Sequence, residues 1–83
     1  GKIFCMKVQV LFFGATAEAV GEREISLDLP DRAETKADAA FQQILADYPA
    51  LKNHKLLFAV NQEYAGGGET IKNGDELAIF TAV

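Results

Sequence analysis

Alternating apolar and polar residues near the start of the chain, at positions 6–13, predict a β-strand. One side of this strand is apolar along its whole length and comprises Val8, Val10 and Phe12. The other side begins polar but becomes apolar at Leu11 and Phe13. One end of the strand is therefore expected to be covered on both sides.

A second stretch, Glu24–Leu29, alternates strictly, as a strand with one buried side does, and a proline follows it. Its apolar positions are Ile25, Leu27 and Leu29. The segment between the two strands, Gly14–Gly21, is alanine-rich and bracketed by glycines, which predicts a short helix that ends before Gly21. The two strands are expected to pair antiparallel across this wide connection.

Between Thr35 and Tyr48 the apolar period becomes that of an α-helix. The stripe comprises Ala37, Ala40, Phe41, Ile44, Leu45 and Tyr48. Thr35 is expected to cap the N-terminus, with Asp38 as a capping-box partner, and Pro49 to end the helix. We expect this one long helix to pack its stripe on the apolar sides of the first two strands.

Two nearly continuous apolar runs, within Lys55–Val60 and Glu76–Thr81, predict strands in the last third of the chain. Such runs are typical of strands that are covered on both sides or that keep one side for a partner. A tight turn at Asn61-Gln62 and a short extended stretch, Glu63–Ala65, follow the first run. Asn73-Gly74-Asp75 is the turn before the second.

The charge balance narrows the choice of partner. Eight basic and twelve acidic residues give a net charge of −4, and no cluster of lysine or arginine is present to follow a phosphate backbone or an anionic lipid surface. Neither nucleic acid nor a membrane is therefore expected as a partner, whereas a basic groove on another protein would suit this chain.

Length and cysteine content predict one packed domain in a reducing compartment. Residues 6–83 are expected to form that domain, and residues 1–5, which precede Met6, to be an extension or a cloning remnant. Cys5 is the only cysteine, so stability depends on packing. With no signal peptide and no apolar run of about 18 residues, we expect a cytoplasmic protein.

Candidate catalytic and ligand-binding motifs have simpler interpretations. Gly66-Gly67-Gly68 lacks the lysine and helix of a phosphate-binding loop and is interpreted as a flexible surface loop. His54 has no neighbours at metal-ligand spacing, and Asp75 and Glu76 suit a turn. No metal site and no catalytic triad is predicted, so the chain is not expected to have an active site of its own.

Three segments together, at this order and spacing, carry a resemblance that covers residues 6–83. They read MKVQVLFFGATAEAVG, LLFAVNQEY and NGDELAIFTAV, and the chain resembles the small, sulfur-carrying subunit of molybdopterin synthase. The resemblance implies an α+β, β-grasp (ubiquitin-like) fold, with a mixed sheet of four to five strands covered by one long helix. It also implies that the first and last strands lie parallel in the middle of the sheet.

The resemblance further implies chemistry that partners perform on the carrier. A ubiquitin-activator-like adenylating enzyme uses ATP to activate the C-terminal glycine of such a carrier, and sulfur transfer then forms a thiocarboxylate. The large catalytic subunit of molybdopterin synthase receives this tail and builds the dithiolene of the pterin. The carrier itself binds no cofactor. Glycine leaves a narrow active-site channel unobstructed, which suits a tail of this kind.

Aromatic residues on opposite sides of the strands predict an exposed docking surface. One helix covers one side of the sheet, so adjacent aromatics such as Phe12 and Phe13 cannot both face it. In the resembling family the matching positions contribute to an apolar patch that contacts both partners. The partner-binding residues that follow from the resemblance are Phe13, Tyr64, Phe80, Thr81, Ala82 and Val83.

The end of the sequence departs from the family, whose members end in valine, a small residue and two glycines. Val83 matches the valine, and nothing follows it. Three explanations stay open: a lost tail, a piece cut from a longer polypeptide, and a relative that never carries sulfur. Two functions accordingly stand beside that of the molybdopterin synthase carrier: a ubiquitin-like interaction module and a thiamine-pathway sulfur carrier.

Overall fold

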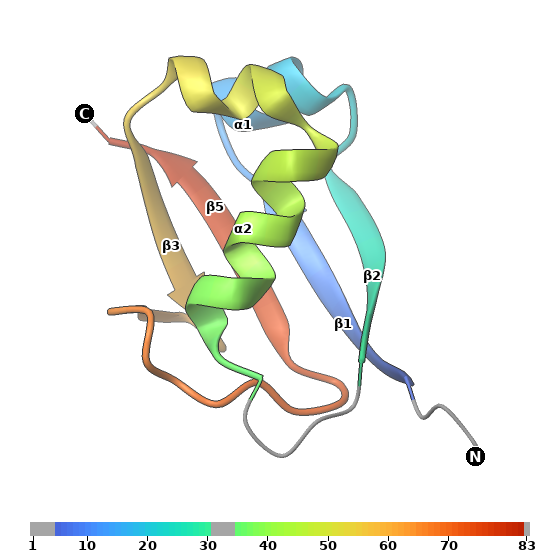
Figure 1. The fold of residues 1–83 in the computed structure, drawn as a ribbon. Coiled ribbons are helices and arrows are strands. Elements are labelled where there is room, and N and C mark those ends of the chain that lie inside the picture. Colours follow the sequence, from blue (N-terminus) through green and yellow to red (C-terminus); the bar gives the residue numbers. More distant parts are fainter. Residues whose placement is uncertain (1–4, 31–34, 83) are drawn as a thin grey trace.

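The computed structural model describes residues 5–30 and 35–82, which form a five-stranded mixed sheet with helices packed on it (Figure 1). The strands are β1 (Cys5–Phe12), β2 (Glu24–Pro30), β3 (Leu56–Val60), β4 (Glu63–Tyr64) and β5 (Glu76–Thr81). The helices are α1 (Ala15–Val20), α2 (Ala37–Asp47) and the 3₁₀ helix η1 (Pro49–Asn53). No helix in the described part is long and apolar enough to cross a membrane.

The strand order is β2-β1-β5-β3-β4, which confirms the predicted β-grasp arrangement. The first and last strands are parallel neighbours in the middle of the sheet, with Phe12 beside Ile79. The β1–β2 and β3–β5 pairs are antiparallel, as expected for strands joined by short or wide connections. The expected extension at residues 1–5 lies outside the described residues, except that Cys5 begins β1.

Helix α2 crosses one face of the sheet and buries its apolar stripe there (Figure 1). Phe41 is 4% exposed, and its ring centroid lies 4.3 Å from that of Phe58 on β3. The core comprises Met6, Val8, Val10, Phe12, Leu27, Leu29, Ala37, Ala40, Phe41, Ile44, Leu51, Ile71, Leu77 and Ile79. The predicted packing of the helix on the inward sides of β1 and β2 is confirmed.

The predicted cap of α2 is wrong. The N-cap residue is Lys36, which makes no side-chain capping bond, and the Thr35 hydroxyl donates to the carbonyl of Pro30 at 3.3 Å. Loop carbonyls take over the role of the cap: the Ala37 N–H donates to the Glu69 carbonyl at 2.7 Å, and the next N–H donates to the Gly67 carbonyl at 2.9 Å. A cap supplied by a distant loop leaves no local sequence signal.

The glycine loop is more ordered by hydrogen bonds than the sequence predicts. The N–H groups of Gly66 and Gly67 donate to the Glu69 carboxylate at 2.8 and 2.9 Å. Gly67 has a φ of 107°, a conformation that favours glycine. The loop is therefore a structural element that caps α2.

Glycine and proline lie where α1 and α2 end, as predicted. Gly21 adopts the left-handed conformation, and its N–H donates to the Ala17 carbonyl at 2.8 Å, which ends α1. Helix α2 ends at Asp47, and Pro49 begins η1, which the sequence analysis did not predict. The fully buried Leu51 attaches η1 to the core.

Candidate functional site

The face of the sheet opposite α2 is open, and the strand register shows which residues lie on it. Leu57 pairs with Phe80, and Ala59 pairs with Ala78 on one side and with Tyr64 on the other. We call the apolar residues of this face the apolar patch: Leu11, Phe13, Leu57, Ala59, Tyr64, Ala78 and Phe80. They come from β1, β3, β4 and β5, or directly follow β1.

Three large side chains of the apolar patch are exposed, and those of Leu11 and Phe80 are half-buried. Phe13, Leu57 and Tyr64 are 43%, 41% and 77% exposed. The Phe13 and Phe80 rings stack with centroids 4.8 Å apart and an interplanar angle of 8°. A groove of about 520 Å³ runs across the patch and is also lined by Gln62 and Glu76. Exposed apolar area of this kind is typical of surfaces that contact another molecule.

The other half of the open face is polar. Gln9 donates to the Ser26 hydroxyl at 3.1 Å, and Lys7 lies 3.9 Å from the Asp28 carboxylate in an exposed ion pair. Such a pair contributes little to stability. The open face is thus apolar where β1 and β5 end and polar where they begin.

A tight turn holds Tyr64 beside the groove. Asn61 and Gln62 have φ values of 49° and 71°, as in the type I′ turns that join tightly paired strands. The Asn61 side chain donates to the Asp75 carboxylate at 3.1 Å, and its oxygen accepts the N–H of Glu76 at 2.9 Å. The predicted turn is confirmed, and its side-chain bonds connect the β3–β4 hairpin to the start of β5.

A buried hydroxyl joins the ends of the two central strands. Thr16 is fully buried, and its Oγ1 lies 2.7 Å from the Phe13 carbonyl and 3.0 Å from the Ile79 carbonyl. One carbonyl belongs to Phe13 and the other to Ile79, which directly precedes Phe80. Thr16 therefore helps to set the position of both stacked rings. The sequence analysis missed this residue, since one threonine in an alanine-rich helix has no distinguishing pattern.

The last described residues show where the chain leaves the sheet. Strand β5 ends at Thr81, as predicted, and Thr81 is half-buried. The N–H of Ala82 still donates to the Lys55 carbonyl at 2.8 Å, so the chain is held by a hydrogen bond one residue beyond the strand. Val83 lies outside the described residues.

The titratable groups of the described residues show no metal-binding arrangement. Within the described residues no group of three or more His, Cys, Asp or Glu side chains could hold a metal ion, and His54 is exposed beyond η1. The pKa of Glu69 is lowered because the N–H of Gly66, its own N–H and that of Gly67 donate to the carboxylate. Glu69 lies in the loop that caps α2, so its charge serves the fold.

The structure brings three of the predicted partner-binding residues together. Phe13, Tyr64 and Phe80 border one groove, and Thr81 and Ala82 lie at the chain exit near it. Sequence reasoning missed Leu57, although the unbroken run Leu56–Val60 indicates that some of its side chains must face away from the helix. It named Leu11 as apolar but did not assign it to the patch.

The chain is similar to known proteins over nearly its whole length. The chain is 38% identical over 80 residues to the molybdopterin synthase sulfur carrier subunit of Caenorhabditis elegans, covering 94% of this chain and 88% of that protein. Its human counterpart is 32% identical over 82 residues, covering 93% and 91%.

Two solved structures share the fold. The small archaeal modifier protein 1 of H. volcanii has a TM-score of 0.81 at 25% identity, with 94% of this chain and 99% of that chain covered. One chain of a protein–protein complex of subunits 1 and 2 of the molybdopterin-converting factor from Helicobacter pylori has a TM-score of 0.65 at 22% identity. The match covers 94% of this chain and 96% of that chain. The model of the ThiS family matches residues 10–83, and the chain belongs to this family.

Proposed function

We propose that this chain is the sulfur-carrier subunit of molybdopterin synthase, which presents a C-terminal thiocarboxylate to the large catalytic subunit for dithiolene formation. The relatives named as this subunit support the assignment, since they match over nearly the whole chain. The observation that carries it is the position of the apolar patch. Its two stacked rings, Phe13 and Phe80, lie at the end of the sheet where β5 leads the chain to Ala82.

The apolar patch serves binding, and the chain exit serves the chemistry of the tail. A partner that covers the patch gains binding energy far from the reacting atom, and that energy positions the tail in the partner's active site. Strand β5 makes this positioning precise, because Leu77 and Ile79 are fully buried and Ala82 is held by Lys55. The carrier itself supplies no acid, base or metal to the reaction.

The proposed partners are the large subunit and a ubiquitin-activator-like adenylating enzyme, in the cytoplasm. The adenylating enzyme uses ATP: the C-terminal carboxylate attacks the α-phosphorus and pyrophosphate leaves, and a hydrosulfide supplied by a donor then attacks the acyl carbon and displaces AMP. The carrier binds no cofactor of its own. A complex of subunits 1 and 2 is known for the molybdopterin-converting factor of Helicobacter pylori, which supports a large-subunit partner here.

Truncating Phe80 tests the docking surface. We expect Phe80→Ala to weaken binding to the large subunit by more than about 1 kcal/mol, because aromatic anchors dominate interface energies. Ser26→Ala, on the polar half of the same face, is the matched control and should leave affinity unchanged. Titration calorimetry of both variants gives the affinities. A variant that binds normally but melts far below the parent protein would place Phe80 in the core and remove the patch.

Extending the chain tests the chemistry. A protein that ends at Val83 should not be adenylated, because a branched side chain occupies the position that the family reserves for glycine. Addition of Ser-Gly-Gly after Val83 should permit ATP–pyrophosphate exchange and, with a sulfur donor, the mass gain of one oxygen replaced by sulfur. Equal activation of both proteins would refute the tail requirement.

The likeness to a small archaeal modifier protein supports a second candidate, a ubiquitin-like modifier. A modifier forms an amide bond from its C-terminus to other proteins, whereas a carrier is released with a new carboxylate. Incubation of the extended protein with the adenylating enzyme and cell extract distinguishes them. Covalent conjugates favour the modifier, and a thiocarboxylate that the large subunit consumes favours the carrier.

A further inference from the structure

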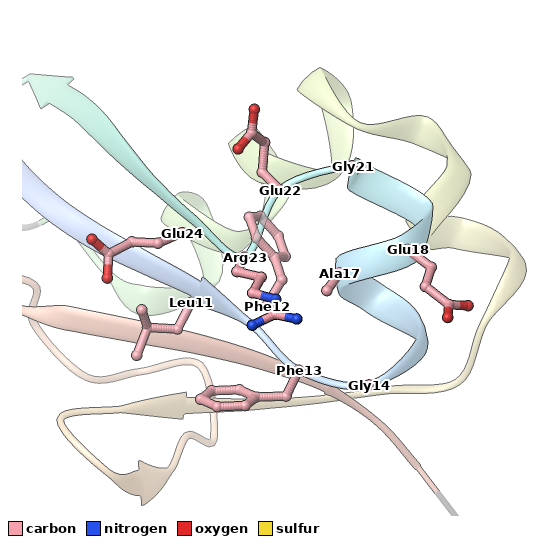
Figure 2. Close-up of a pocket in the computed structure, with 10 residues that line it drawn as sticks. All are labelled: Leu11, Phe12, Phe13, Gly14, Ala17, Glu18, Gly21, Glu22, Arg23 and Glu24. Atoms are coloured by element: carbon pink, nitrogen blue, oxygen red, sulfur yellow. The ribbon is translucent and has the colours of Figure 1, made fainter.

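A second hollow adjoins the apolar patch at the end of the sheet where α1 lies (Figure 2). It encloses about 1040 Å³, is open to solvent, and shares Leu11 and Phe13 with the groove of the patch. On the α1 side, the hollow is lined by the small residues Gly14 and Ala17 and by Glu18. A protein that covers the patch and extends past Phe13 therefore enters this hollow.

Arg23 is the basic residue that lines the hollow. Figure 2 shows its guanidinium directed toward β1 and Phe13, whereas the carboxylates of Glu18, Glu22 and Glu24 point away from it. Within the described residues, the ion pair of the molecule joins Lys7 and Asp28 at the other end of β1, so the guanidinium has no carboxylate partner there.

The backbone holds both walls of the hollow in place. The Phe12 N–H donates to the Arg23 carbonyl at 2.9 Å, and the Phe13 N–H donates to the Ile79 carbonyl at 3.0 Å. Arg23 and Phe13 are thus attached to neighbouring positions of one central strand. A partner meets an apolar surface and a cation in a fixed relative arrangement, which is the basis of specific recognition.

Covering the hollow changes the energy of the arginine. A docked protein removes water from Leu11, Phe13 and the guanidinium together, and a desolvated charge is costly unless it is paired. A carboxylate meets this need best, because the planar guanidinium donates two parallel hydrogen bonds to it. The net charge of −4 predicts a partner surface that is basic overall. The carboxylate expected opposite Arg23 is a local exception to that prediction.

We infer that Arg23 is a specificity-determining residue, which receives an aspartate or glutamate side chain of the large subunit when that protein docks on the apolar patch. This inference rests on the proposed function and deepens it. It names one charged contact, at the edge of the patch nearest α1, made by the basic residue among the glutamates that line the hollow.

Charge reversal separates this contact from the overall charge. Arg23→Glu should weaken binding to the large subunit by at least about tenfold at low salt, and Arg23→Gln by less, because only the former adds repulsion. The control Lys72→Glu makes the same change of charge at an exposed position beside the turn at Asn73, which precedes β5. If the partner surface is basic overall, this control should leave affinity unchanged or raise it.

Salt provides the second measurement. The difference in affinity between the parent protein and Arg23→Gln should shrink as ionic strength rises, whereas the effect of Phe80→Ala should persist. Equal effects of Arg23→Glu and Lys72→Glu would overturn the inference, and so would a gain of affinity in Arg23→Glu. If either occurs while Phe80→Ala still weakens binding, the proposed function stands. Absence of binding by the parent protein would overturn both.

Discussion

Replacing Thr16 by valine tests how the two central strands are held together. Valine has nearly the shape of threonine, so the change removes one buried hydroxyl and little packing. The two carbonyls near that hydroxyl keep other donors: the Phe13 carbonyl accepts the Thr16 N–H at 3.3 Å, and the Ile79 carbonyl accepts the Phe13 N–H at 3.0 Å. No buried acceptor is therefore left without a partner.

The expected cost is that of one net hydrogen bond. This is about 0.5–1.5 kcal/mol in the free energy of unfolding, below the roughly 1–3 kcal/mol that an orphaned buried group costs. For a domain of this size a loss of about 1 kcal/mol lowers the melting temperature by roughly 4–8 °C. Thr16→Ser is the matched control, because it keeps the hydroxyl and removes a buried methyl group.

Urea unfolding of both variants measures these costs, and binding to the large subunit separates their causes. Thr16→Val should also weaken binding, since the hydroxyl bridges the strands next to Phe13 and Phe80, whereas Thr16→Ser should bind like the parent protein at low urea. A valine variant as stable as the parent would show that the hydroxyl bonds contribute nothing. A loss of roughly 2–3 kcal/mol would show that a carbonyl has been orphaned.

Two further predictions concern the fold. Phe41→Ala should cost roughly 3–5 kcal/mol in unfolding free energy, because the buried ring leaves a cavity beside Phe58; the exposed neighbour change Gln42→Ala is the control, and equal costs would refute the packing. Glu69→Gln should destabilise the protein at neutral pH. The folded pKa of Glu69 is lowered, so its contribution is present above the unfolded value near 4.5 and is lost as pH falls through the folded value. The difference in melting temperature between parent and variant should therefore vanish in acid; a difference that is constant with pH would contradict the role of the charge.

The strands and α-helices of this fold were predictable because each is an apolar, alternating or alanine-rich stretch bounded by turn-forming residues. The apolar stripe from Ala37 to Tyr48 has the spacing of a helix, and Pro49 cannot continue that helix. The open face was also predictable in outline, since Phe12 and Phe13 lie on opposite sides of one strand and one helix covers one side. Periodicity indicates which residues share a side.

Contacts between distant segments were not predictable in this way. Thr35 has the chemistry of a cap, but the carbonyls of Gly67 and Glu69 take that place, and no local pattern reports a loop about 30 residues away. The burial of Thr16 likewise depends on Ile79. Leu57 belongs to the apolar patch only because the register of β3 with β5 sets it opposite Phe80. Register is a property of the assembled sheet.

The parallel pairing of β1 and β5 explains why the proposed contacts gather in one place. Parallel strands end at the same edge of a sheet, so the residue after β1, Phe13, lies beside Phe80 near the end of β5. Antiparallel pairing would put these rings at opposite ends and would separate the patch from the chain exit. Arg23 reaches the same edge because β2 runs antiparallel to β1 and begins where β1 ends. One topological choice therefore places an apolar anchor, a cation and the exit of the chain within reach of a single partner.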